Sequence, residues 1–185
     1  GALTAVGDAS MTAVAGSLSA TAEVSTNGAL KMAAGQSITL GAQQTSAAGN
    51  AVISAGQTLM LGGALVALSG TLSSGGDIVG GGASAFTQAA VVGAGNDVNL
   101  TGVLDAGQLQ VQAGNSATLA NVASATTLGI EAFGFAGGGD IALNGVSSVV
   151  GSAQLSAARD VDMAGTLQGG GAIVLNGGRN VTVTE

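Results

Sequence analysis

The chain has 185 residues and a net charge of −7, and 34 residues are glycine, whereas proline, cysteine, histidine, tryptophan and tyrosine are all absent. Its 46% hydrophobic content excludes an intrinsically disordered chain, which would be poor in apolar residues and rich in charge. Because cysteine and histidine are missing, disulfide frameworks, the usual zinc sites and His-dependent catalytic triads are excluded as well.

The few charged side chains also limit the partners that the chain can bind. Lys31, Arg159 and Arg179 are the only cationic residues, so we expect no nucleic-acid partner. A charge-free stretch from Met32 to Gly76 is interrupted throughout by glycine and polar residues, so we expect no membrane-embedded segment. The first 20 residues lack both the charged and the apolar part of a secretory signal, which predicts an interior or mature segment of a longer protein.

A unit of about 20 residues recurs along the chain, as in the related phrases "AGQSITL", "AGQTLML", "AGNDVNL" and "ARDVDMA". In each unit an apolar residue follows a polar one, and the residue two positions later is mostly apolar too. This alternation predicts a short strand with one buried face. The aligned apolar positions, 19 to 24 residues apart, are Leu18, Ile38, Leu59, Ile78, Val98, Ala117, Ile141, Val161 and Val181.

Two further apolar segments complete each unit. Six residues before the aligned position stand Thr12, Met32, Ile53, Leu72, Val92, Val111, Phe135, Leu155 and Leu175. Eight residues before it stand Leu30, Ala51, Ala90, Leu109, Phe133, Ala153 and Ile173, with Ser10 and Gly70 as exceptions. A third, weaker segment follows a glycine, and we expect Val103, Val146 and Leu167 to be its inward residues.

Three short strands in every 20 residues predict a right-handed parallel β-helix, or β-solenoid, of about nine coils that forms a single domain over residues 1–185. Each residue would stack on its counterpart about 4.8 Å away in the next coil, so that columns of aliphatic side chains are buried continuously. Each fully buried Leu, Ile or Val contributes roughly 1.5 to 3 kcal/mol, which stabilises such a chain without disulfides. No periodic stretch of helical length competes with this interpretation.

Two small-residue columns mark a corner of the coil. Three residues before the aligned position a glycine recurs, which predicts positive φ or close approach of neighbouring coils. It is found at Gly35, Gly56, Gly75, Gly95, Gly114, Gly138 and Gly178, and Ala158 replaces it in one other unit. Directly before the aligned position the residue is always Ser, Thr, Asp or Asn, types whose side chains bond to nearby backbone at turns. These are Ser17, Ser37, Thr58, Asp77, Asp97, Ser116, Asp140, Asp160 and Asn180.

One coil, around residues 121–138, is longer than the others, because Ala117 and Ile141 are 24 residues apart. Alignment of the columns puts the extra residues near Ala123 to Gly129, before Phe133 and Phe135. We expect a bulge or small loop there. Loops on a rigid scaffold often carry function, but irregular packing around the two phenylalanines is the favoured explanation.

The units "GALKMAAGQSITLG" (Gly28–Gly41), "GQLQVQAGNSATLA" (Gly107–Ala120) and "GAIVLNGGRNVTVT" (Gly171–Thr184) resemble the haemagglutinin-type repeats of filamentous haemagglutinin. That family comprises large two-partner-secretion exoproteins, including adhesins and contact-dependent inhibition proteins. The resemblance covers nearly the whole chain and implies a piece of the shaft of a secreted or surface-displayed rod. It also implies an outer-membrane transporter as the export partner, and a receptor or glycan on a host or neighbouring cell as a target.

Asp140, Asp160 and Asp162 form the best cluster of carboxylates for a site. Asp140 and Asp160 would lie in one column of adjacent coils, and Asp162 two residues along the same face. They could bind a cation, or act as paired acids in glycoside hydrolysis. The alternative, that they cap turns and face solvent near Arg159 and Arg179, is favoured. Asp77 and Asp97 form a second pair with no further ligand, and the nine-residue period of calcium-binding repeats is absent.

The sequence therefore predicts a structural shaft or spacer that presents adhesive or effector modules away from a bacterial cell. We expect no enzyme activity, no catalytic residue, no metal and no cofactor. A polysaccharide-binding or polysaccharide-cleaving β-helix is the alternative. The end coils of such a segment would expose apolar side chains and unpaired strands, so end-to-end association of the segment is also expected.

Overall fold

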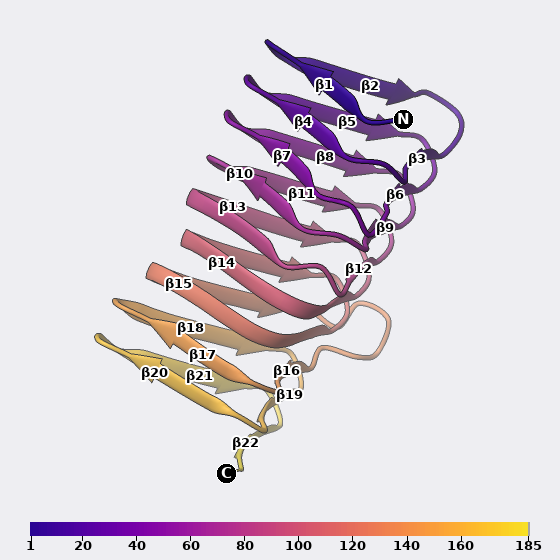
Figure 1. The fold of residues 1–185 in the computed structure, drawn as a ribbon. Coiled ribbons are helices and arrows are strands. Elements are labelled where there is room, and N and C mark those ends of the chain that lie inside the picture. Colours follow the sequence, from indigo (N-terminus) through magenta and orange to yellow (C-terminus); the bar gives the residue numbers. More distant parts are fainter. Residues whose placement is uncertain (185) are drawn as a thin grey trace.

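The chain forms one stack of parallel β-coils, as seen in a computed structural model that describes residues 1–184 (Figure 1). All pairings between its 22 strands are parallel, and each joins a strand to its counterpart one coil away. The chain advances along the stack as a right-handed coil (Figure 1). The predicted parallel β-solenoid of about nine coils is confirmed. Within the described residues there is no helix of the length and apolarity needed to span a membrane.

The strands form three faces, which we number in the order in which the chain enters them. Face one contains β1 (Leu3–Ala5), β4 (Val24–Thr26), β7 (Thr45–Ala47), β10 (Leu65–Ala67), β17 (Val146–Val149) and β20 (Thr166–Gly169). Face two contains β2 (Ala9–Ala13), β5 (Leu30–Ala34), β8 (Ala51–Ala55), β11 (Gly70–Ser74), β18 (Ser152–Ala157) and β21 (Ile173–Gly177). Face three contains β3 (Leu18–Ala20), β6 (Ile38–Leu40), β9 (Leu59–Leu61), β12 (Ile78–Gly80), β16 (Ile141–Leu143), β19 (Asp160–Met163) and β22 (Asn180–Val183).

Three longer strands pass over the corners without a break. β13 (Ser84–Ala94) continues from face one into face two, whereas β14 (Val98–Ala113) and β15 (Ala117–Ala132) cover all three faces of their coils. Register shifts near Ala106 and Gln108 show that the bend is made by bulges instead of breaks. The longest uninterrupted strands therefore lie in the middle of the stack.

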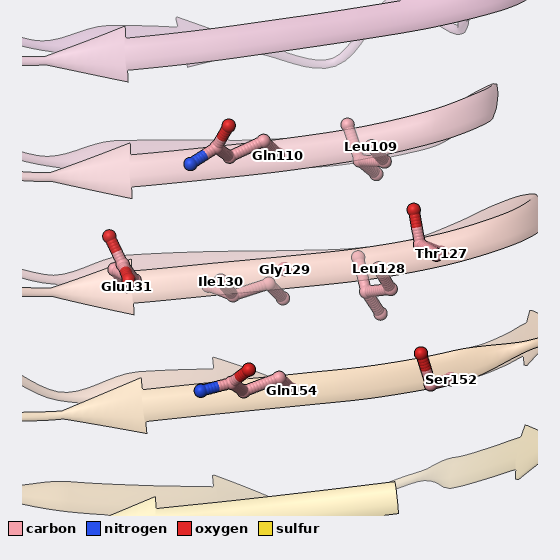
Figure 2. A pocket seen from close by; sticks show the side chains of 9 residues that line it. All are labelled: Leu109, Gln110, Thr127, Leu128, Gly129, Ile130, Glu131, Ser152 and Gln154. Atoms are coloured by element: carbon pink, nitrogen blue, oxygen red, sulfur yellow. The ribbon is translucent and has the colours of Figure 1, made fainter. Parts of the chain in front are cut away.

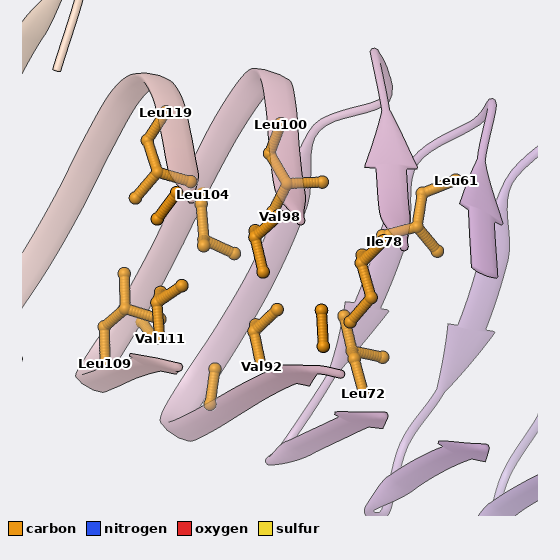
Figure 3. Packing of buried hydrophobic residues seen from close by; sticks show 14 of the residues in the cluster. Leu61, Leu72, Ile78, Val92, Val98, Leu100, Leu104, Leu109, Val111 and Leu119 are labelled. Carbon is orange, nitrogen blue, oxygen red and sulfur yellow. The ribbon is translucent and has the colours of Figure 1, made fainter. Parts of the chain in front are cut away.

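The nine aligned apolar residues predicted from the sequence all pair with one another in face three, from Leu18 on Ile38 to Val161 on Val181. In β6, Ile38 and Leu40 are buried and Thr39 between them is partly exposed, as the alternation predicts. Together with Leu and Val from the other faces they form one continuous apolar core (Figure 3). Each column stacks like on like, so that every coil covers the apolar side chains of the next.

Several predicted inward positions are wrong by one residue. In the first coil Ala9 and Met11, not Ser10 and Thr12, pair with Leu30 and Met32, because this coil is one residue longer at the glycine corner.

On face one, Val103 and Val146 are exposed, and the inward residues are Leu104 and Ser147. Leu167 packs against the core as predicted. The error at Val103 and Val146 arises because β-branched residues were favoured as core, although they fit the solvent side of a strand equally well.

The longer coil also differs from the prediction. Phe133 and Phe135 do not enter the core columns; Leu128 and Ile130 take those places, pairing with Leu109 and Val111. Most of the extra length therefore lies after these residues, in a loop over residues 133–140 that joins β15 to β16 (Figure 1). The predicted segment from Ala123 to Gly129 is mainly a continuous part of β15.

The recurring glycine is required by close approach between coils and not by a positive φ. A Cβ atom at Gly95 would lie 2.2 Å from the carbonyl oxygen of Gly75, which is the equivalent glycine one coil earlier. Positive φ is instead found in the loop 133–140, for example 75° at Gly134 and 100° at Gly139. There the chain must turn back to reach face three.

Candidate functional site

The polar column at the glycine corner forms a ladder of hydrogen bonds between coils. Oδ1 of Asp97 accepts hydrogen bonds from the backbone N–H of Ser116 and from Nδ2 of Asn115, both at 2.9 Å. Asp77 accepts in the same way from Asp97 N–H at 3.2 Å and from Asn96 Nδ2 at 2.7 Å. Each carboxylate therefore caps the corner of the following coil, which refines the predicted role as a cap of its own turn.

The ladder continues past the long loop. The Oγ atom of Ser116 lies 3.2 to 3.3 Å from the backbone N–H groups of Gly139 and Asp140 and accepts from both. Oδ1 of Asp140 in turn accepts from the N–H of Asp160 at 3.2 Å. Asp140 and Asp160 are thus neighbours in one column, as the sequence predicted, and they connect the loop to the C-terminal coils.

Two arginines neutralise these two carboxylates. Arg159 Nε lies 3.3 Å from Oδ1 of Asp140, and its Nη1 donates to the carbonyl oxygen of Gly137 in the loop at 2.7 Å. Arg179 binds both carboxylate oxygens of Asp160, with Nε 3.0 Å from Oδ1. The hydrogen bonds from Arg179 lower the pKa of Asp160 below its ordinary value of 3.8, despite the opposing effect of desolvation. Asp160 is therefore ionised and paired.

Asp162 does not join this network in the residues that the structure describes. It lies on β19, where its backbone pairs with Ala142 and Thr182, and its side chain is exposed. Over the same residues no group of three Asp, Glu, His or Cys side chains is placed to hold a metal ion. The three aspartates thus divide into a paired structural ladder and a solvent-facing strand residue.

A hollow on face two was not predicted from the sequence. It has a volume of about 350 Å³ and lies over β15, between β14 and β18. Gln110, Gly129 and Gln154 follow one another in a single outward column, so the two amides flank a position without a side chain (Figure 2). Glu131 lies at one end of the hollow, and Thr127 and Ser152 lie at the other (Figure 2). Only the strand register places these residues together.

A second, smaller hollow continues from the first along β15. It is lined by Glu131, Phe133, Ser156 and Ala158, among others, and has a volume of about 210 Å³. Phe133 is 46% exposed and stacks on Phe135, with ring centroids 5.5 Å apart and planes 7° from parallel. The exposed aromatic pair is thus at the end of β15, next to the polar hollow.

Comparison with known proteins adds no relative: no family model, no curated protein and no solved structure matches the chain.

Proposed function

We propose that this chain is a shaft or spacer segment of a secreted or surface-displayed bacterial exoprotein, holding adhesive or effector modules away from the cell. The observation that carries the proposal is the continuous stacking of all three faces, with every coil paired to the next by parallel strands. A stack of this kind transmits length and stiffness along one axis, since each coil contacts only its neighbours. Filamentous haemagglutinin-type repeats, which the sequence resembles, would serve this purpose.

The corner ladder and the glycine contacts support a mechanical role. Backbone hydrogen bonds between coils, such as Asn96 N–H to Gly76 O at 3.0 Å, join successive corners, and Asp77, Asp97 and Asp140 each add a capping carboxylate. An arrangement that satisfies its polar groups in the neighbouring coil resists local opening, because exposing one coil unpairs the next. We also propose that the chain is secreted or displayed on the cell surface and that an outer-membrane transporter exports it. Both proposals rest on the resemblance to filamentous haemagglutinin-type repeats.

Polysaccharide cleavage is the less favoured alternative on this geometry. A general acid and a base need free carboxyl groups on either side of a bound sugar. Asp140 is instead paired with Arg159 and a backbone N–H, and Asp160 is paired with Arg179 and the side-chain amide of Asn180, so their present arrangement serves the corner. That the chain has no enzyme activity remains a prediction, which a survey of polysaccharides for newly formed reducing ends would check.

The spacer proposal can be tested by lengthening the rod by whole coils. Duplicating residues 59–97 directly after Asp97 adds two coils in register, since Leu59 and Val98 occupy the same column. We expect this variant to remain folded, to be longer by about 10 Å in small-angle scattering, and to reach the surface of producing cells unchanged. Insertion of only residues 88–97 adds half a coil and is the matched control, which should misfold.

Two results would contradict the proposal. One is recovery of the native chain only from inside its producing cells, protected from added protease. The other is a half-coil insertion that is tolerated as well as the two-coil insertion, because the stacking register would then not carry the structure.

A further inference from the structure

We propose that the hollow over β15 and the adjacent Phe133 form a binding site for a linear, neutral oligosaccharide. This proposal is independent of the spacer role, because a rod can serve as a spacer with or without a binding site on its surface. Its basis is the outward face of three adjacent strands, β14, β15 and β18 (Figure 2).

The absence of a side chain at Gly129 creates the hollow. On either side, Gln110 and Gln154 are in register with Gly129, about 9.6 Å apart at two inter-strand spacings. A Cβ atom built on Gly129 would meet nothing within 4 Å, so the vacancy is open to solvent and not filled by a neighbour. A third glutamine here would have completed an amide ladder across the hollow. The glycine leaves room for a ligand group between two amides.

The polar groups around the vacancy suit sugar hydroxyls. Among the described residues, the amides of Gln110 and Gln154 have no hydrogen-bond partner, and each offers a donor and an acceptor. Glu131 adds a carboxylate that is oriented by Gln112, whose Nε2 donates to Oε2 at 3.0 Å. Side chains of this kind, fixed on rigid strands, can exchange hydrogen bonds with several hydroxyl groups at once.

Phe133 supplies an apolar surface directly after β15, next to the polar hollow. Residues 129, 131 and 133 alternate outward along one chain, so Phe133 begins about 13 Å from the vacancy. Glu131 lines both hollows and thus connects the amide pair with the aromatic ring. The stacking with Phe135 holds the ring in place, so it can cover the apolar face of a pyranose without first being ordered.

The charge of the residues that line the two hollows favours a neutral sugar. Among the described residues that line the two hollows, Glu131 is the only acidic one and none is basic. An acidic polysaccharide would place its carboxylates or sulfates next to Glu131 without a compensating charge. A flat, solvent-open hollow of this size also fits a few sugar units along the strand better than a small enclosed metabolite.

Titration of the chain with oligosaccharides, followed by amide chemical shifts in two-dimensional NMR, tests the site. The probes are cellotetraose and chitotetraose as neutral sugars and tetragalacturonate as an acidic one. We expect saturable shifts with at least one neutral sugar, a Kd of about 1 mM or lower, and changes confined to residues 108–112, 127–133 and 152–158. The acidic sugar should cause no saturable change at these amides.

Gly129→Gln should fill the vacancy and weaken binding of the neutral sugar at least about tenfold. The matched control is Gly93→Gln, which places the same side chain at another outward glycine of face two with nothing within 4 Å. Its affinity should stay within about twofold of the original. If Gly129→Gln loses the native spectrum, the double variant Gln110→Ala and Gln154→Ala replaces it, since both side chains are outside the core.

Phe133→Ser should weaken binding about fivefold, whereas Phe135→Ser should have a smaller effect because Phe135 does not line the hollow and acts only by stacking on Phe133. The proposal is overturned if neither neutral sugar gives saturable shifts, or if tetragalacturonate binds the same amides as tightly. It is equally overturned if Gly129→Gln, or the double glutamine variant that replaces it, and Phe133→Ser bind the neutral sugar like the native chain.

Discussion

The regular coils between β5 and β14 and the long coil formed by β15 and the loop 133–140 use the same core but different corners. In the regular coils the glycine corner has three residues, such as 95–97, and its glycine lies against the backbone of the preceding coil. In the long coil the same corner has eight residues, which include the exposed aromatic pair, and the vacancy at Gly129 lies shortly before it on β15. The regular corner brings two coils into backbone contact, whereas a hollow with polar side chains lies close to the longer corner.

A buried hydroxyl in a regular coil and one next to the long coil also differ in their hydrogen bonding. Thr26, on face one of an early coil, donates its hydroxyl hydrogen to Gly28 O at 2.9 Å. Ser147 lies on face one directly after the long coil, is fully buried, and its hydroxyl has no partner among the described residues. Satisfied polar groups are the rule in protein interiors, so the hydroxyl of Ser147 is a local defect in the polar packing next to the long coil.

The largest effect is expected from breaking a regular corner. In Gly95→Val the new Cβ would be 2.2 Å from Gly75 O, so the backbone of two coils must separate. We expect a loss of about 3 kcal/mol or more in the free energy of unfolding, measured by urea denaturation. Gly93→Val is the control, because a Cβ there meets nothing within 4 Å. If both variants were equally stable, close approach would not explain the glycine column.

The next effect concerns the carboxylate ladder. Asp97→Ala leaves the N–H of Ser116 and the amide of Asn115 without their acceptor, and we expect a loss of about 1 to 2 kcal/mol. Asp97→Asn keeps one oxygen acceptor at the same place and should lose less than half as much. Equal losses in the two variants would show that the charge, and not the acceptor, stabilises the corner.

Sequence reasoning predicted the fold well because the solenoid repeats one pattern, and errors in a single coil do not change the alignment of the others. The face-three column was correct from Leu18 to Val181 for this reason. The insertion was misplaced because two adjacent pairs, Leu128 with Ile130 and Phe133 with Phe135, have the same alternation, and hydrophobicity alone does not distinguish them. In this coil the aliphatic pair takes the core columns and the two rings remain outside, although Phe86 is buried on face one of an earlier coil.

The candidate sites could be predicted only in part. The neighbourhood of Asp140 and Asp160 follows from their common column, but the orientation of Arg159 and Arg179 depends on side-chain geometry. The hollow at Gly129 could not be predicted, because a glycine next to two glutamines is visible only after the register of three strands is known. A single sequence shows the glycine but not which side chains lie next to it in the neighbouring coils.

A stabilising substitution can test whether the long coil disturbs the core. Ser147→Ala removes the unpartnered buried hydroxyl, and we expect a gain of about 1 kcal/mol in the free energy of unfolding. Thr26→Val is the matched control in a regular coil, where the hydroxyl bonds to Gly28 O, and it should lose about 1 kcal/mol. A loss in the Ser147 variant would show that its hydroxyl is satisfied in solution.

The smallest effect is expected from the exposed pair of Asp160 and Arg179, which holds the corner after the long loop. Since the hydrogen bonds from Arg179 lower the pKa of Asp160, the pair stabilises the folded chain above the ordinary pKa of 3.8, and this contribution is lost as the pH falls through the lower, folded-state value. Arg179→Gln should therefore reduce the thermal midpoint slightly at pH 7 and by less at pH 2, and 1 M salt should diminish the difference at pH 7. Lys31→Gln, at an exposed position on face two with no ion pair in the described residues, controls for the loss of one positive charge. If Arg179→Gln lowered the midpoint equally at both pH values, the arginine would act through packing, and the corner after the long loop would not depend on its charge.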